Sequence, residues 1–221
     1  MELSIFEVLG PVMIGPSSSH TAGAARLARV AAEIAQKPFG RVEFGLSGSF
    51  AKTCRGHGTD KALLAGAIGL SPDDEQIADA EKLAAKAGVE WRLYREDLDW
   101  MHENSVHIIF HHEDDTSTEI WGSSIGGGRI EITRIGDFET RIHAENPTML
   151  VNHLDRPGVI SELSRVLAHY EVNIAVLRLS RVGRGRQANA MFIVDNEIPQ
   201  AAVDELNALP HVEEVVVVDV S

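Results

Sequence analysis

Beyond Pro147, the apolar positions of this chain switch repeatedly between the period of a strand and the period of a helix. Four short runs rich in apolar and β-branched residues predict strands, at 148–154, 174–181, 187–194 and 212–220. Between them, residues 159–170 and 199–209 place their apolar side chains on one helical face. A glycine-rich segment, 183–185, joins the middle two strands as a hairpin turn. The resulting βαββαβ order is the ferredoxin-like arrangement, in which two helices cover one face of an antiparallel sheet.

The preceding residues predict a second, less regular domain. Its predicted helices span residues 21–36, 59–69 and 72–87. Its predicted strands span residues 42–46, 89–94, 105–111, 116–121, 129–134 and 138–144. Several of these strands follow one another closely enough to form hairpins, so we expect a mixed α+β domain with a mostly antiparallel sheet. A proline ahead of a fresh apolar run marks the boundary, and the chain is therefore predicted to be an α+β protein with domains 1–145 and 146–221.

The net charge excludes several classes of function. Twenty Lys and Arg residues oppose thirty-three Asp and Glu residues, a formal net charge of −13. Fourteen acidic and four basic side chains fall within residues 71–119, which we interpret as a solvated surface. So acidic a chain is not expected to bind nucleic acid or anionic lipid. No apolar run approaches the ~20 residues of a membrane span, and the N-terminus lacks the features of a signal peptide, so we expect a cytoplasmic protein.

Cysteine and histidine content bears on metal binding. A single cysteine, Cys54, excludes an internal disulfide and any thiolate metal cluster built by this chain alone, and we interpret it as a small loop residue. Four histidines lie near several carboxylates, at His102, His107, His111 and His112. Strand alternation directs His112 away from His107 and His111, so we interpret these histidines as solvated surface residues and expect no metal site.

Hydroxyl side chains gather beside a histidine immediately before the first predicted helix. These residues are Ser17, Ser18, Ser19, His20 and Thr21. The N–H groups at a helix N-terminus favour a carboxylate or a phosphate, and the hydroxyls add hydrogen-bond donors. Plain helix capping explains one of the hydroxyls, so a binding site and a cap stay open as interpretations. We do not favour a serine nucleophile with His20 as its base, because no G-x-S-x-G elbow surrounds it.

Two further glycine-rich segments carry candidate chemistry. In residues 46–61, glycines on both sides of His57 leave space for a ligand, and Thr59 or Asp60 is expected to cap the following helix. This segment is not a P-loop, because G-x-x-x-x-G-K-[ST] is absent. In residues 122–129, three consecutive glycines indicate either a close backbone approach or a flexible loop.

Three sequence segments and the C-terminal pattern together resemble one known family. The segments GPSSSHTAG, SGSFAKTCRGHGTDKA and SSIGGG, followed by the βαββαβ order, resemble the beta chain of the bacterial iron–sulfur L-serine dehydratases over essentially the whole chain. The resemblance implies a serine dehydratase beta-type domain over residues 1–145, similar to the allosteric substrate-binding domain of some phosphoglycerate dehydrogenases. It implies an ACT domain over residues 146–221. It also implies a separate alpha chain whose cysteines hold a 4Fe–4S cluster, which agrees with the single cysteine here.

The resemblance further implies an activity and roles for individual residues. The family removes water from L-serine, and the resulting enamine hydrolyses to pyruvate and ammonia, a step of amino-acid catabolism that feeds gluconeogenesis. Iron acts as a Lewis acid on the leaving hydroxyl, and a base takes the α-proton. His57 and Thr59 are expected nearest the catalytic cleft. Substrate or effector contacts are expected from Ser17, Ser18, Ser19, His20, Thr21, Ser123, Gly126, Gly127, Asp155 and Gly158.

The turn Asp155-Arg156-Pro157-Gly158 matches the place where ACT domains often receive an amino acid. Asp155 or Pro157 is expected to open the following helix, and Asp155 is expected to face a ligand ammonium group. ACT domains also associate through edge strands or helices, so we expect self-association. A domain that only dimerises, with an empty turn, is the alternative. Gly158→Val is expected to crowd the turn without touching the core.

Three functions follow from these observations. The favoured hypothesis is the beta subunit of a heteromeric L-serine dehydratase, inactive in isolation, whose partner alpha chain carries the cluster. The main alternative is a stand-alone amino-acid sensor whose ACT domain regulates another enzyme, because this chain has no cofactor site of its own. A serine hydrolase is the third, and it predicts labelling of one serine by an organophosphonate probe.

Overall fold

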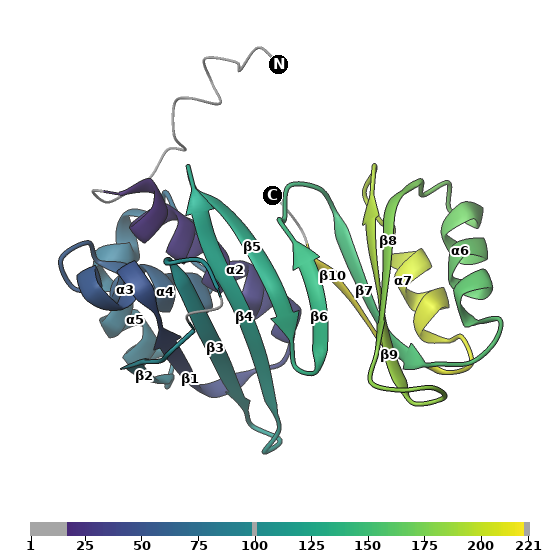
Figure 1. Ribbon diagram of the computed structural model, residues 1–221, viewed down its shortest axis with the longest axis horizontal. Coiled ribbons are helices and arrows are strands. Elements are labelled where there is room, and N and C mark those ends of the chain that lie inside the picture. The colour runs from purple at the N-terminus through teal and green to yellow at the C-terminus, as the bar shows by residue number, and fades with distance from the viewer. Residues whose placement is uncertain (1–16, 99–100, 219–221) are drawn as a thin grey trace, which may run out of the picture. The chain divides into compact units, whose positions relative to one another are not determined.

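The structure, a computed structural model, describes residues 17–98 and 101–218 and divides the chain into two compact units, Met1–Gly136 and Asp137–Ser221. Each unit contains helices and strands, so the predicted α+β class is confirmed (Figure 1). The division falls ahead of the predicted boundary at 145/146, because strand β6 (Phe138–Ile142) is grouped with the second unit. Residues 1–16, on which the signal-peptide expectation rests, and the end of the last predicted strand lie outside the described residues.

The strands of the first unit bury one face of their sheet. In spatial order they are β2 (Glu90–Arg95), β1 (Phe39–Leu46), β3 (Ser105–His112), β4 (Ser117–Gly126) and β5 (Arg129–Ile135). β1 and β2 pair in parallel, whereas β1–β3, β3–β4 and β4–β5 pair antiparallel, as the sequence predicts. Val42 and Phe44 lie opposite Phe110 and Ile108, and all four side chains are fully buried. Alternation along each strand therefore creates the apolar face.

Helices cover this apolar face (Figure 1). They are η1 (Ser18–Ala22), α2 (Gly23–Ala35), α3 (Gly48–Thr53), α4 (Thr59–Ala67), η2 (Glu75–Asp79) and α5 (Ala80–Lys86). Small residues let α2 and α4 approach closely, since a Cβ on Gly66 would lie 2.0 Å from the carbonyl oxygen of Ala25. The start of α2 thereby lies beside the start of α4, where the Thr21 hydroxyl donates to the His57 carbonyl oxygen at 3.1 Å.

Two helices differ from their predicted form, and one was not predicted. The helix predicted over 21–36 begins as the π-helical turn η1 and continues as α2. The helix predicted over 72–87 starts only after Asp74, whose side chain accepts from the Gln76 N–H, and it changes from the 3₁₀ turn η2 to α5 at Ala80. The six-residue α3 buries Phe50, too few apolar positions to create a helical period.

The second unit has the predicted βαββαβ order after β6. Its elements are β7 (Thr148–Leu154), α6 (Val159–His169), β8 (Ile174–Arg181), β9 (Gln187–Val194), α7 (Gln200–Asn207) and β10 (Val212–Val218). The antiparallel sheet has the order β10-β7-β9-β8, and α6 and α7 pack on one face of it (Figure 1). Leu163 and Leu167 of α6 and Leu206 of α7 meet Met149 and Phe192 of the sheet in one buried core.

The turn before α6 differs from its predicted form. Gly158, at φ 94°, precedes the first residue of α6, and no side chain caps the helix, so the expectation that Asp155 or Pro157 opens it is wrong. A left-handed φ of this size requires glycine. A Cβ at Gly158 would have no heavy atom within 4 Å, so a Gly158→Val substitution strains the backbone rather than crowding the turn.

Candidate active site

The hydroxyl-rich segment forms a π-helical turn at the start of α2. Ser17 caps this turn, because its Oγ accepts from the His20 N–H at 3.2 Å, while the Thr21 N–H donates to the Ser17 carbonyl at 2.9 Å. Ser18 and Ser19 are half-buried and follow the cap directly. Capping thus accounts for one hydroxyl and leaves the others for further contacts. Short π-helical turns are frequent at functional sites. The two residues before Ser17 in the GPSSSHTAG segment lie outside the described residues.

His20 is held at both ring nitrogens by hydroxyl groups. Its Nδ1 lies 3.3 Å from Ser17 Oγ, and its Nε2 lies 3.0 Å from Ser49 Oγ in α3. Burial, and then the nearby His57, lower the pKa of His20, although Glu103 acts in the opposite direction. The ring is therefore neutral near pH 7, with one nitrogen donating and the other accepting. Ser49 was not among the predicted site residues, because only the fold places α3 against the π-helical turn.

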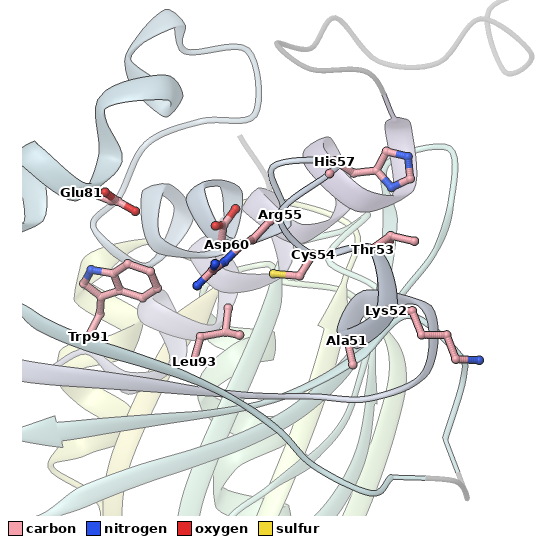
Figure 2. A pocket seen from close by; sticks show the side chains of 11 residues that line it. Ala51, Lys52, Thr53, Cys54, Arg55, His57, Asp60, Glu81, Trp91 and Leu93 are labelled. Carbon is pink, nitrogen blue, oxygen red and sulfur yellow. The ribbon is translucent and has the colours of Figure 1, made fainter.

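His57 lies 4.9 Å from His20, measured between ring centroids. Its backbone N–H donates to the Thr53 carbonyl, and its carbonyl accepts from Thr21, so the loop around it is fixed on both sides. Figure 2 shows its ring directed away from Arg55 and Asp60. Nδ1 of His57 is buried and has no hydrogen-bond partner within the described residues. An unsatisfied buried nitrogen costs about 1–3 kcal/mol, which is typical of a site completed by an added group.

Thr59 is fully buried at the start of α4, and its Oγ1 has no hydrogen-bond partner in the described part of the chain. The expectation that Thr59 or Asp60 caps α4 is wrong. Gly58, at φ 68°, precedes the helix without a side-chain cap, and the Asp60 carboxylate accepts from the adjacent Lys61 N–H at 2.9 Å. The Thr59 hydroxyl, freed from capping, is a second unsatisfied polar group beside His57 in the chain.

In residues 122–129, the serine with an unsatisfied buried hydroxyl is Ser124, whereas the predicted binding residue is Ser123. The buried hydroxyls of Ser123 and Ser105 lie 2.8 Å apart and satisfy each other. Ser124 is the next residue of β4, so its side chain points to the opposite face. Its Oγ is buried without a partner in the described residues, and it would lie 2.0 Å from a Cβ on Gly23 of α2. The absence of a side chain at Gly23 therefore makes room for Ser124.

The glycines after Ser124 differ in their surroundings. A Cβ on Gly126, at φ 96°, would lie 4.0 Å from Ser19 Oγ, so this turn borders the hydroxyl-rich segment. Gly127, at φ 62°, has open space around it. The structure therefore brings Ser17–Thr21, His57, Thr59 and the end of β4 to one corner of the first unit.

Asp155 and Gly158 belong to the second unit. The Asp155 carboxylate accepts from the Gly185 N–H at 3.1 Å and from Arg181 Nη1 at 2.9 Å. The bond from Gly185, followed by that from Arg181, lowers the pKa of Asp155. The sequence predicts that the Asp155 carboxylate faces a ligand ammonium group. In the structure, one oxygen of this carboxylate already holds the β8–β9 hairpin against the turn.

Two of the four clustered histidines are buried, contrary to the expectation that they are solvated. His107 stacks on Trp121 at 4.1 Å between ring centroids, and its Nδ1 lies 3.1 Å from Glu96. His112 lies between the Pro38 carbonyl and the Thr118 hydroxyl. Within residues 17–98 and 101–218, no group of three or more His, Cys, Asp or Glu side chains is arranged to hold a metal ion.

Fold and site together define an α+β chain whose second unit is an ACT domain, since the family model described as "ACT domain" matches residues 148–211. The model described as "Serine dehydratase beta chain" matches residues 4–117. The chain belongs to the serine dehydratase beta chain family.

Relatives support this membership over most of the chain. A "Probable L-serine dehydratase, beta chain" from Bacillus subtilis (strain 168) is 40% identical over 212 residues, 96% of each chain. An "L-serine dehydratase, beta chain" from Peptoniphilus asaccharolyticus is 42% identical over 181 residues, 81% of this chain and 82% of the relative. A D-3-phosphoglycerate dehydrogenase from Methanocaldococcus jannaschii is 24% identical over 88 residues, 40% of this chain and 17% of that protein. No helix in the described residues is long and apolar enough to cross a membrane.

Proposed function

We propose that this chain is the beta subunit of an L-serine dehydratase, which converts L-serine to pyruvate and ammonia. The observation that carries this proposal is the 40% identity to a probable L-serine dehydratase beta chain over 96% of both lengths. Because the match runs through both units, it supports a shared role for the whole chain and not only for the ACT domain.

The residues of this chain do not fit a 4Fe–4S cluster. Such a cluster needs several thiolates, and the chain has one cysteine. Burial, and then the charge of Asp60, raise the pKa of Cys54 to about 11, so the thiol stays protonated at neutral pH. We therefore assign the cluster to a separate alpha chain and expect the isolated beta chain to be inactive.

The unsatisfied groups around η1 support a role in handling the substrate. We assign removal of the α-proton to His57, whose buried Nδ1 has no hydrogen-bond partner in the described residues. The half-buried hydroxyls of Ser18 and Ser19 suit the serine carboxylate. His20, neutral and held by Ser17 and Ser49, fixes the turn that carries these hydroxyls. Thr59 and Ser124 supply further hydroxyls at the same corner.

Anaerobic purification of the tagged full-length chain from its own organism tests the proposal. We expect a cysteine-rich second chain to co-purify, with a brown colour that oxygen bleaches and with serine-dependent pyruvate formation. A colourless chain without such a partner and without pyruvate formation would overturn the proposal in favour of a stand-alone amino-acid sensor. Labelling of one serine by an organophosphonate probe would instead favour a hydrolase.

A further inference from the structure

The segment between α3 and α4 has a second side, away from the His57 ring. On that side lies a surface pocket of about 1020 Å³, bordered by α3, the first turn of α4, α5 and β2. Figure 2 shows Arg55, Asp60, Trp91 and Leu93 around this pocket, with the His57 ring pointing out of it. The pocket is therefore separate from the corner that holds His20 and Ser124, although both use the same loop. Its volume is typical of small-molecule sites.

One wall of the pocket is apolar. Trp91 and Leu93 are two residues apart on β2, so their side chains project from the same face of this edge strand. Both are half-buried. Cys54 adds a buried thiol that is neutral at physiological pH, because burial raises its pKa to about 11. A ligand can thus bury an apolar side chain here without meeting a charge on this wall.

The remaining groups carry both signs of charge. Arg55 supplies a guanidinium, and Asp60 and Glu81 supply carboxylates. In the described part of the chain, neither the Arg55 side chain nor the Glu81 side chain makes a hydrogen bond or an ion pair, and one Asp60 carboxylate oxygen accepts from the Lys61 N–H. A simple anion would meet two carboxylates here, and a simple cation would meet the guanidinium. A ligand that bears both charges satisfies the set, because guanidinium pairs with carboxylate and carboxylate with ammonium.

We propose that this pocket binds a free α-amino acid with an apolar side chain. Its carboxylate pairs with Arg55, its ammonium group with Asp60 and Glu81, and its side chain packs against Trp91 and Leu93. The site is distinct from the one that handles serine in the proposed function. Arg55 is two residues from His57, so an amino acid bound to Arg55 contacts the same loop that holds the His57 ring, and the chain senses a second amino acid beside its substrate.

Calorimetry on the purified full-length chain tests this proposal without any dehydratase activity. L-leucine is the probe, and 4-methylpentanoate and isopentylamine are matched analogues that each lack one charge. We expect saturable binding of L-leucine and at least about tenfold weaker binding of each analogue, since each analogue lacks one of the two charged groups that pair with the pocket. Arg55→Gln and Trp91→Ala should each weaken L-leucine binding by at least about tenfold.

Lys52→Gln is the control, because Lys52 borders the pocket but points away from it in Figure 2. The Lys52→Gln variant should bind L-leucine as tightly as the unaltered chain. Circular dichroism verifies that each variant is folded. The proposal is overturned by an absence of saturable L-leucine binding up to about 20 mM. Equal binding of L-leucine by the Arg55→Gln variant and the unaltered chain overturns it as well. Because no outcome depends on an alpha chain, failure here leaves the proposed function untouched.

Discussion

Individual side chains at the corner formed by the starts of α2 and α4 and the end of β4 are arranged for contact with a group beyond this chain. His57 Nδ1, Thr59 Oγ1 and Ser124 Oγ are buried without a hydrogen-bond partner in the described residues. Folded proteins satisfy most of their buried polar groups, so three unsatisfied ones in one corner indicate a site that substrate, water or a partner chain completes.

His57→Ala should lower the turnover of the assembled enzyme by about 100-fold or more, the usual contribution of a general base. The half-buried ring has few packing contacts to lose, so the variant should fold and still pair with the alpha chain. Steady-state pyruvate formation and gel filtration measure the two effects. His169→Ala, an exposed histidine of the second unit, is the control. Near-normal turnover of the His57→Ala enzyme would remove His57 from the chemistry.

The pKa of His20 gives a prediction about pH. Burial and then His57 lower this pKa below its usual value of 6.5, so between the two values the unfolded chain binds a proton that the folded chain does not. Acidification through this window therefore reduces the stability contributed by His20. His57→Gln should raise the midpoint of the His20 titration toward 6.5, as followed by NMR of its ring. An unchanged midpoint would show that the two rings are not coupled.

The site residues that escaped prediction depend on tertiary placement. Ser49 reaches His20 only because the short α3 folds against η1. The sequence does not single out Ser124, because the predicted strand ends at residue 121 whereas β4 extends five residues further, to Gly126. Likewise, His107 is buried because its register partner in β4 is Trp121, a contact between distant parts of the sequence. The hydrophobic period within one segment does not show which distant segment the folded chain places beside it.

Among helices, the close contact between α2 and α4 holds the two halves of the site together. Gly66→Ala would place a Cβ 2.0 Å from the carbonyl oxygen of Ala25. We expect the first unit to lose about 1–3 kcal/mol of unfolding free energy, the usual cost of overpacking. Thermal and urea unfolding measure the change. Gly40→Ala is the control, since its Cβ would meet no heavy atom within 4 Å. Equal loss in both variants would contradict the account of the helix pair.

Strand β8 is the edge on which self-association of the second unit is expected. Four apolar side chains are exposed on or just after it, namely Val176, Leu177, Leu179 and Val182, and Leu179 is 58% exposed. Edge strands with exposed apolar side chains favour pairing with another chain. Leu179→Glu should convert a dimer of the full-length chain to a monomer in light scattering, whereas Ala201→Glu, at an exposed position of α7, should not. A dimer that survives Leu179→Glu would exclude this edge.

The sequence predicts the bounds of the helices and strands better in the second unit than in the first. Strands β7, β8 and β9 have the predicted bounds, because each is a short run of mostly apolar residues next to a turn. In the first unit, the alanine-rich α2 and α4 are buried on several sides, and the short α3 has no period at all. Hydrophobic periodicity marks an element with one buried face, and it fades where burial is complete or the element is short.

We propose that the chain as a whole supplies groups that bind and deprotonate L-serine, whereas its single cysteine is too few for an iron–sulfur cluster. Its identity to L-serine dehydratase beta chains runs through both units. The central claim is therefore that activity requires a second, cysteine-rich chain.

Anaerobic reconstitution with iron and sulfide, followed by an assay of serine-dependent pyruvate formation, tests this claim most directly. The full-length chain treated alone should form no pyruvate above the background, and adding a similarly treated alpha chain should restore pyruvate formation. Serine-dependent pyruvate formation by this chain alone would contradict the account, as would its absence from the complete mixture.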